Sequence, residues 1–196
     1  FARTPTELEQ IRGGELALIP QNSGQSLTPT LRIGAQLVEA LRLHADVPEA
    51  QYSAKAIELL GQVRLPDPAA IMTRFPHELS GGQQQRAAIA MALAGEPTAL
   101  LLDEPTTGLD PQAKRNLWNL AKTLNEEGMT IVLTTHNMEE AEYLCDRIAI
   151  MDQGSIIAQD TPQQLILDYA PEPPAAPMQG NIEDVFLSLT GHGLRD

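Results

Sequence analysis

The apolar residues of this chain follow different patterns before and after Pro97. Before it, from residue 30 to residue 95, they recur at helical spacing, as in Leu31, Leu37, Val38 and Leu41 and again in Ile57 and Leu60. After it, short unbroken apolar runs alternate with stretches of helical spacing. An unbroken apolar run is typical of a strand that is buried in a parallel sheet. The pattern therefore predicts helices before Pro97 and an α/β arrangement after it.

The second part of the chain contains a predicted strand, helix and second strand. The strands are the apolar segments 98–103 and 129–135, which we expect to be buried on both faces. Asp110 and Pro111 are typical of a helix start, and Gly128 is typical of a helix end. Between them, the apolar residues at helical spacing are Leu117, Leu120, Ala121 and Leu124. This order of elements predicts a parallel crossover unit.

Further elements are predicted towards the two ends of the sequence. The pattern predicts a short apolar strand over residues 15–19, which ends at Pro20, and a helix over residues 138–144. Two short apolar segments around a turn at 153–154 predict a hairpin. Residues 170–177 contain four prolines and are expected to be a linker. A last amphipathic helix has its apolar side formed by Ile182, Val185, Phe186 and Leu189.

Composition narrows the classes of function that the chain can have. The 196 residues include 26 acidic and 13 basic side chains, which gives a formal net charge of −13. A field of that sign repels a phosphate backbone, so we expect no nucleic-acid partner. The one cysteine, Cys145, cannot form an internal disulfide and is most simply a core residue. No apolar run is long enough to cross a bilayer, so a role at a membrane requires another chain to cross it.

The residues that could carry out chemistry lie at the ends of the predicted strands. In open parallel sheets, ligands bind at the carboxyl ends of strands, where Asp103, Glu104 and His136 occur. One of two adjacent carboxylates can hold Mg²⁺ while the other polarises a water, as phosphoryl chemistry requires. The simpler alternatives are an acidic turn for the pair and a helix cap for His136. A glutamine that leaves a strand, such as Gln21, needs no function by itself.

A second candidate site is the start of a predicted helix in the segment LSGGQQQRAAIAMALA, residues 79–94. Ser80 is a typical helix cap, and the alanines favour a helix. Capping does not explain Gly81 and Gly82, because glycine at a helix start costs conformational entropy. Two glycines would let backbone N–H groups approach an anion at the positive end of the helix. Phosphate binding and simple capping are therefore both open for this segment.

The order of these features resembles the nucleotide-binding domain of ABC transporters. The matching positions are Gln21 for the Q-loop, 79–83 for the LSGGQ signature, 100–104 for the Walker B strand, 108–110 for the D-loop and His136 for the switch histidine. The resemblance covers nearly the whole chain, and the signature with the Walker B strand is its most specific part.

The resemblance implies an α/β fold with a P-loop NTPase (RecA-like) parallel-sheet core, truncated at its N-terminus and carrying an inserted helical subdomain. Residues 1–26 would be the N-terminal remnant of the core, and 27–97 the helical subdomain that ends in the signature helix. Residues 98–169 would complete the core, and 170–196 would form the proline-rich linker and the C-terminal helix.

The resemblance also assigns roles at the acidic pair. Asp103 would coordinate Mg²⁺, and Glu104 would be the general base for the water that attacks ATP. His136 would contact the γ-phosphate. Gln21 would sense the metal and the water, and would link the site to the membrane subunit.

Partners follow from the same resemblance. Ser80, Gly81, Gly82 and Gln83 would contact ATP held by a second ABC nucleotide-binding domain, in a head-to-tail dimer. Asp110 would help the two domains communicate. Transmembrane permease subunits would be the other partners, and the helical subdomain would dock on them. The chain would then be cytoplasmic and peripheral to the inner face of the plasma membrane.

One family motif, the phosphate-binding loop G-x-x-x-x-G-K-[ST], does not occur in this sequence. None of the three lysines, Lys55, Lys114 and Lys122, follows a glycine. Either the chain is the carboxyl-terminal part of a longer protein, which we expect, or it is a degenerate domain. Reading the frame upstream of Phe1 distinguishes the two. We expect that this 196-residue polypeptide alone neither hydrolyses ATP nor binds it tightly, and micromolar affinity with magnesium in a nucleotide-binding assay would contradict this.

Membership of the family does not by itself establish transport. Residues 18–44 resemble the Q-loop region of peptide and nickel importer ATPases, whereas the tail over 181–196 resembles that of drug-export ATPases. The substrate and the direction of transport therefore stay open. The alternatives are a non-catalytic ABC-type module that supplies only a signature to a partner, and a soluble ABC ATPase outside transport.

Overall fold

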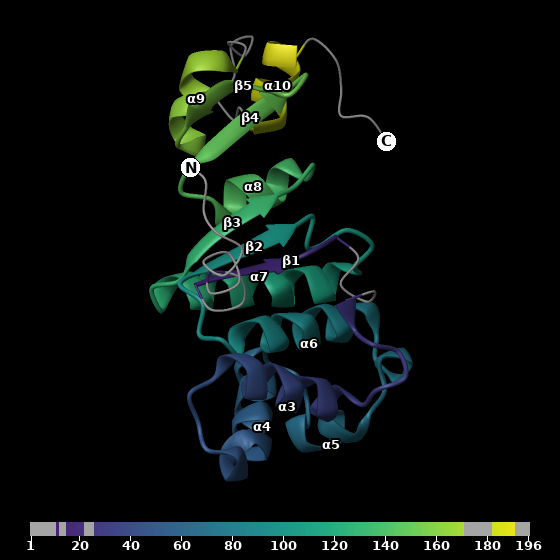
Figure 1. Ribbon diagram of the computed structural model, residues 1–196. Coiled ribbons are helices and arrows are strands. Elements are labelled where there is room, and N and C mark those ends of the chain that lie inside the picture. The colour runs from purple at the N-terminus through teal and green to yellow at the C-terminus, as the bar shows by residue number, and fades with distance from the viewer. Residues whose placement is uncertain (1–10, 12–14, 22–25, 171–181, 191–196) are drawn as a thin grey trace. The chain divides into compact units, whose positions relative to one another are not determined.

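A computed structural model of the chain describes residues 11, 15–21, 26–170 and 182–190 (Figure 1). The chain divides into two compact units, residues 1–134 and residues 135–196. Each unit has a hydrophobic core of its own. None of the helices in the described part of the chain is both long enough and apolar enough to cross a bilayer.

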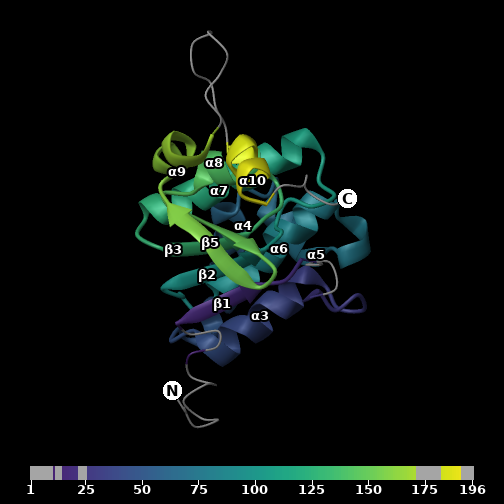
Figure 2. The same ribbon diagram turned by 90° about the horizontal axis from the view of Figure 1, so that it is seen from above.

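The described residues of the first unit contain a parallel sheet of three strands in the order β1-β2-β3 (Figure 2). The strands are β1 (Leu16–Ile19), β2 (Ala99–Asp103) and β3 (Thr130–Thr134). Helix α7 (Pro111–Glu126) connects β2 to β3. The register places Leu18 beside Leu101 and Asp103 beside Thr134. The predicted parallel crossover unit is therefore confirmed.

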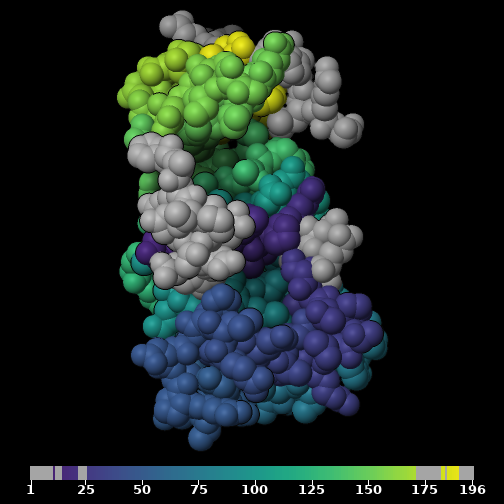
Figure 3. Space-filling view, in the orientation of Figure 1, coloured from purple at the N-terminus to yellow at the C-terminus, as the bar shows by residue number. Residues whose placement is uncertain are grey.

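One face of this sheet is packed, and the other is partly exposed. The buried positions alternate along β1 and β2 and lie in the core that includes α6 (Gly81–Leu93): Ala17, Ile19, Leu100 and Leu102. On the opposite face, Leu18 is 62% exposed and Val132 is 53% exposed. The space-filling view shows β1 at the surface of this unit (Figure 3, purple). The prediction that the second strand of the crossover unit is buried on both faces is wrong, because exposed and half-buried residues alternate along β3.

Short helices form the rest of the first unit. They are α3 (Ile33–His44), α4 (Tyr52–Gln62) and α5 (Pro68–Thr73), with 3-10 turns η1 (Glu49–Gln51) and η2 (Pro76–Glu78). Figure 1 shows α6 between these helices and the sheet. The helices pack on one another through fully or almost fully buried side chains, namely Ile33, Leu37, Leu41, Ala56, Leu59, Leu60 and Ile71.

Two residues that the predicted helical stripes assign to the core are exposed instead. Leu31 precedes α3 and is 42% exposed, and Ile33 takes the core position. Ile57 is 39% exposed, because the buried residues of α4 are Ala56, Leu59 and Leu60. That set has the spacing i, i+3 and i+4 of one helix face. The prediction for Leu60 is confirmed, and Ile57 lies one residue from the buried Ala56.

In its described residues, the second unit combines a hairpin with three helices. Its elements are α8 (Met138–Leu144), β4 (Ile148–Asp152), β5 (Ser155–Asp160), α9 (Pro162–Tyr169) and α10 (Ile182–Thr190). Strands β4 and β5 pair antiparallel, and Gln153 and Gly154 in the turn have φ values of 46° and 79°. Positive φ at both positions is typical of a tight hairpin turn. The predicted hairpin and both predicted helices are confirmed.

The core of this unit is formed by Ile150, Ala158, Leu165, Ile182 and Val185. Phe186 and Leu189 pack against it, so the predicted apolar side of the last helix is confirmed. The predicted linker over 170–177 lies outside the described residues, apart from Ala170.

Cys145 is half-buried at the end of α8. Burial, together with the charges of Glu140 and Asp146, raises the pKa of its thiol to about 11. The thiol is therefore protonated at neutral pH, which disfavours a nucleophilic role.

Candidate functional site

The acidic pair lies where β2 ends. Asp103 is the last residue of β2, and Glu104 follows it with a φ of 43°. This left-handed conformation is uncommon for a residue other than glycine and occurs preferentially at functional sites. The Glu104 backbone N–H donates to the Thr134 carbonyl oxygen (3.0 Å) and is 3.2 Å from the Thr134 Oγ1. The end of β3 therefore fixes the backbone of Glu104.

Thr134 also contacts the other carboxylate. Its Oγ1 donates to the Asp103 Oδ1 at 2.5 Å, while the same oxygen accepts from the Glu104 N–H. One hydroxyl thus orients both members of the acidic pair. Thr134 is not among the predicted site residues. The signal that could have found it is the register of the two strands, which pairs Thr134 with Asp103.

The Glu104 carboxylate receives two hydrogen bonds on one oxygen. Gln21 donates from Nε2 to the Glu104 Oε2 at 2.9 Å, and Thr107 donates from Oγ1 to the same atom at 3.0 Å. Gln21 follows β1 after Pro20 and lies 83 residues before Glu104 in the sequence. The structure therefore brings together Gln21, Asp103 and Glu104. Thr107 is a second contact that the sequence did not indicate.

The donor atoms at this strand end fit one kind of metal ion. Asp103 and Gln21 offer oxygen atoms, which are the ligands that Mg²⁺ prefers. In the described part of the chain, no group of three or more His, Cys, Asp or Glu is arranged to hold a metal. Mg²⁺ often uses one or two carboxylates together with phosphate oxygens of a substrate. The donor set therefore fits Mg²⁺ that is bound together with a nucleotide, and does not fit an all-protein cage.

Helix α6 begins with a complete capping box. The Ser80 Oγ accepts from the Gln83 N–H at 3.4 Å, and the Gln83 Oε1 accepts from the Ser80 N–H at 3.0 Å. Capping by Ser80 is therefore confirmed. Binding of an anion by Ser80, Gly81, Gly82 and Gln83 stays a prediction.

Asp110 caps the next helix of the unit. Its Oδ1 accepts from the N–H groups of Gln112 and Ala113, both at 3.0 Å, and Pro111 occupies the first turn of α7. Gly108, just before it, has a φ of 75°, which glycine adopts without strain. The predicted cap is confirmed. The role of Asp110 in communication between two domains is not tested by this arrangement.

The beginnings of α6 and α7 touch each other through Gly82. A Cβ atom added at Gly82 would lie 2.8 Å from the Cβ of Ala113, closer than real Cβ atoms approach other atoms. At Gly81, an added Cβ would lie 3.8 Å from the Leu109 Cδ2, which is an ordinary contact. Packing against α7 is thus a reason for glycine at position 82 that the sequence alone did not reveal.

We expect Gly82→Ala to destabilise the chain, although alanine favours a helix. Overpacking of this kind costs about 1–3 kcal/mol, more than the helix propensity that alanine gains. The free energy of unfolding in urea measures the effect. The double variant Gly82→Ala with Ala113→Gly should recover most of the loss, and Gly81→Ala is the matched control. Equal stability of the two single variants would contradict the contact.

Arg86 connects α6 to the helices before it. Its Nη1 donates to the Arg64 carbonyl oxygen at 2.7 Å, and its Nε donates to the Gly82 carbonyl oxygen at 3.1 Å. Arg64 in turn donates from Nη2 to the Thr123 Oγ1 on α7 at 3.0 Å. Burial lowers the pKa of the Arg86 guanidinium. These bonds hold the start of α6 against both neighbours.

His136 belongs to the second unit and is exposed. The alternative role of a helix cap falls to its neighbour, because the Asn137 Oδ1 accepts from the Glu140 N–H at the start of α8. The role of His136 at the acidic pair stays a prediction.

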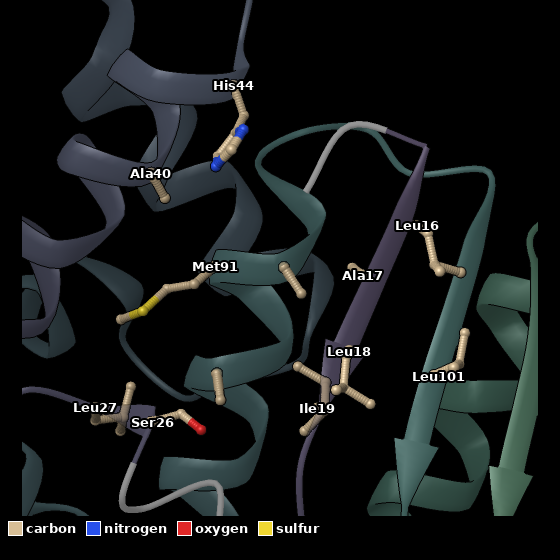
Figure 4. Close-up of a pocket in the computed structure, with 12 residues that line it drawn as sticks. Leu16, Ala17, Leu18, Ile19, Ser26, Leu27, Ala40, His44, Met91 and Leu101 are labelled. Atoms are coloured by element: carbon tan, nitrogen blue, oxygen red, sulfur yellow. The ribbon is translucent and has the colours of Figure 1, made fainter. Parts of the chain in front are cut away.

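A mainly apolar pocket of about 590 Å³ lies elsewhere in the first unit (Figure 4). Residues of β1, α3 and α6 line it, including Leu18, Ala40, His44 and Met91. None of the predicted site residues is part of its lining. We therefore locate the candidate site at the strand ends rather than in this pocket.

Comparison with known proteins places the chain in a family. Residues 3–107 match the family described as ABC transporter. The chain is 36% identical over 173 residues to the glutathione import ATP-binding protein GsiA of Shigella dysenteriae serotype 1 (strain Sd197), a match that covers 88% of this chain and 27% of that protein. It is 37% identical over 169 residues to GsiA of Escherichia coli (strain K12), covering 86% of this chain and 27% of the relative. The chain thus spans about a quarter of the length of these curated relatives.

Solved structures agree with this assignment. The dimeric post-hydrolysis structure of the ATP-binding cassette MJ0796 bound to ADP and Pi has a TM-score of 0.70 and 30% identity, and the match covers 81% of this chain and 68% of that chain. The structure of cbiO1 from Clostridium perfringens, part of the ABC transporter complex cbiONQ, has a TM-score of 0.73 and 25% identity over 84% of this chain and 64% of that chain. The chain has the P-loop NTPase fold of these cassettes, and it belongs to the ABC transporter family.

Proposed function

We propose that the chain is part of an ATP-binding and ATP-hydrolysing subunit that powers the movement of a substrate through a separate membrane subunit. The observation that carries this proposal is the fixed position of Glu104. Its carboxylate accepts from Gln21 and Thr107, its backbone is bound by Thr134, and Asp103 lies beside it.

In this proposal Glu104 is the general base. Its carboxylate accepts a proton from the water that attacks the γ-phosphorus, and the two hydrogen bonds on Oε2 keep the carboxylate oriented towards that water. Asp103, with the Oε1 of Gln21, would hold Mg²⁺, which neutralises charge on the phosphate oxygens when it is bound. His136 would contact the γ-phosphate.

The signature residues act on a second domain in this proposal. Ser80, Gly81, Gly82 and Gln83 would contact ATP held by the opposite protomer of a head-to-tail dimer, and Asp110 would lie at the contact between the two. The dimeric form of the similar MJ0796 cassette supports such an assembly. Within each protomer, the contact of Gly82 with Ala113 would keep the signature helix next to the segment that Asp110 caps.

Import is the direction that the relatives favour. GsiA is named a glutathione import ATP-binding protein. We therefore propose small peptide-like molecules as the class of substrate, and transmembrane permease subunits as partners at the cytoplasmic face of the membrane. The division into four parts, with boundaries after residues 26, 97 and 169, remains part of this proposal.

The test is ATP hydrolysis by the full-length gene product, reconstituted with its membrane subunits in lipid vesicles. We expect hydrolysis that requires Mg²⁺ and that rises when glutathione or another short peptide is present on the substrate side. A rate no higher than that of empty vesicles would overturn the proposed activity. Hydrolysis without stimulation by any peptide would overturn the proposed class of substrate and leave the ATPase in place.

A further inference from the structure

We propose that Thr107 is a positioning residue for Glu104, which it holds in place through its hydroxyl group. This inference rests on the proposed function, in which Glu104 is the base. It adds a residue that neither the motif pattern nor the family match assigns. The direct observation is the hydrogen bond from the Thr107 Oγ1 to the Glu104 Oε2 at 3.0 Å.

The backbone between the two residues explains why they meet. The Thr107 N–H donates to the Glu104 carbonyl oxygen at 3.2 Å, which closes a tight turn with Pro105 at its second position. Proline is favoured there because its fixed φ suits the turn. Both Pro105 and Thr106 are buried, so the turn is packed in place. The turn therefore places Thr107 next to Glu104, so that the Thr107 hydroxyl contacts the Glu104 carboxylate.

The Glu104 side chain needs such a contact. A glutamate has several rotatable bonds, and fixing it in one conformation costs conformational entropy. The bonds from Thr134 fix only its backbone. Gln21 reaches the carboxylate from a segment 83 residues away, whereas Thr107 is three residues away and joined to it by a closed turn. Thr107 is therefore the local contact that selects the side-chain conformation. Its hydroxyl is neutral, so it orients the carboxylate without adding a positive charge beside it.

Thr107 also connects the base to the signature helix. It is followed by Gly108, whose φ is 75°, and then by Leu109, whose side chain lies next to Gly81. The Leu109 N–H donates to the Thr106 carbonyl oxygen at 3.2 Å, so a second turn overlaps the first. A shift of the backbone at the start of α6 can thus alter the position of Glu104, because the two turns and the Thr107 hydroxyl connect them.

The experiment compares Thr107→Val and Thr107→Ser in the full-length gene product with its membrane subunits. Valine keeps the shape of threonine and removes the hydroxyl, whereas serine keeps the hydroxyl. We expect Thr107→Val to lower kcat about tenfold, because a displaced catalytic group loses much of its effect. The KM for ATP should stay within about twofold, because the contact acts on the base and not on bound ATP. Thr107→Ser should keep kcat within about twofold of the unmodified protein.

Two further measurements separate positioning from a structural role. The affinity for ATP, measured by fluorescence of a labelled nucleotide, and the midpoint of thermal unfolding should be unchanged in Thr107→Val. Thr98→Val is the matched control, because it removes another exposed threonine hydroxyl, which donates to the Glu15 carbonyl oxygen at 3.0 Å. This control should leave kcat unchanged.

The outcomes are distinct. Unchanged kcat in Thr107→Val would overturn the inference, and so would an equal loss of kcat in Thr107→Ser. A loss of ATP affinity or of thermal stability in parallel with kcat would assign Thr107 to nucleotide binding or to the fold instead. Failure of the unmodified protein to hydrolyse ATP, or full activity of Glu104→Gln, would overturn the proposed function first, and the role of Thr107 with it.

Discussion

Glu104→Gln is expected to lower ATP hydrolysis by the full-length gene product at least about a hundredfold, the contribution typical of a general base. Glutamine has nearly the same shape as glutamate. Its amide oxygen can still accept hydrogen bonds from Gln21 and Thr107, the two residues that donate to the Glu104 Oε2 in the unmodified protein. The amide cannot accept a proton from the attacking water, so only the chemical step is lost. ATP should consequently remain bound without being turned over.

Release of phosphate and retention of labelled ATP are the two measurements for this variant. Glu39→Gln, at an exposed position of α3, is the matched control and should hydrolyse ATP at the normal rate. Full hydrolysis by Glu104→Gln would remove Glu104 from the role of base. If Glu104→Gln is active while Ser80→Arg abolishes hydrolysis, the chain is instead a module that supplies only its signature to a partner.

Leu41→Ala should lower the free energy of unfolding by about 2–5 kcal/mol, whereas Leu43→Ala should change it by less than about 0.5 kcal/mol. Both residues lie in α3, two positions apart. The Leu41 side chain is fully buried among the helices of the first unit, and that of Leu43 is 69% exposed. The same three carbon atoms are removed in each variant, so only the first leaves a cavity.

Equilibrium unfolding in urea, followed by circular dichroism, measures both variants of this pair. An intact m-value would indicate that the unfolding of the unit stays cooperative. If Leu41→Ala does not fold well enough to be measured, Leu41→Val removes less volume and should give a smaller loss of the same sign. Similar losses in the free energy of unfolding for the two alanine variants would contradict the burial pattern of α3.

Local sequence signals predicted much of the fold. Asp110 with Pro111 marked the start of α7, and the apolar stripe ending at Leu124 marked its buried face. These signals act within a few residues and do not depend on the rest of the chain. The stripes that included Leu31 and Ile57 were less reliable. Leu31 lies before α3, two residues from the core residue Ile33. Ile57 is next to the core residue Ala56, and a shift by one position turns a helical side chain by about 100°.

The exposed face of β3 could not be predicted in the same way. Its apolar residues form an unbroken run, which is typical of strands buried on both faces. Which face of such a run is covered depends on the elements packed against it. In the described residues, Val132 on one face is 53% exposed, and Leu133 on the other is half-buried.

The sequence predicted the charged residues of the candidate site, but it did not predict the threonine hydroxyl groups that contact them. Asp103 and Glu104 stood out because carboxylates seldom follow an apolar strand. Thr134 and Thr107 gave no comparable signal, because threonine is common both in strands and near turns. Only the pairing of β2 with β3 and the turn after Glu104 show that these hydroxyls contact the acidic pair.

The parallel pairing of β1 with β2 has a kinetic consequence for how this chain acquires its site. The pairing joins segments 83 residues apart, whereas the intervening helices form from neighbouring residues. Closing so large a loop is entropically unfavourable and is a slow step in folding. Gln21 reaches Glu104 only when that loop has closed. A newly made chain should therefore form its helices first and bring Gln21 into contact with Glu104 last.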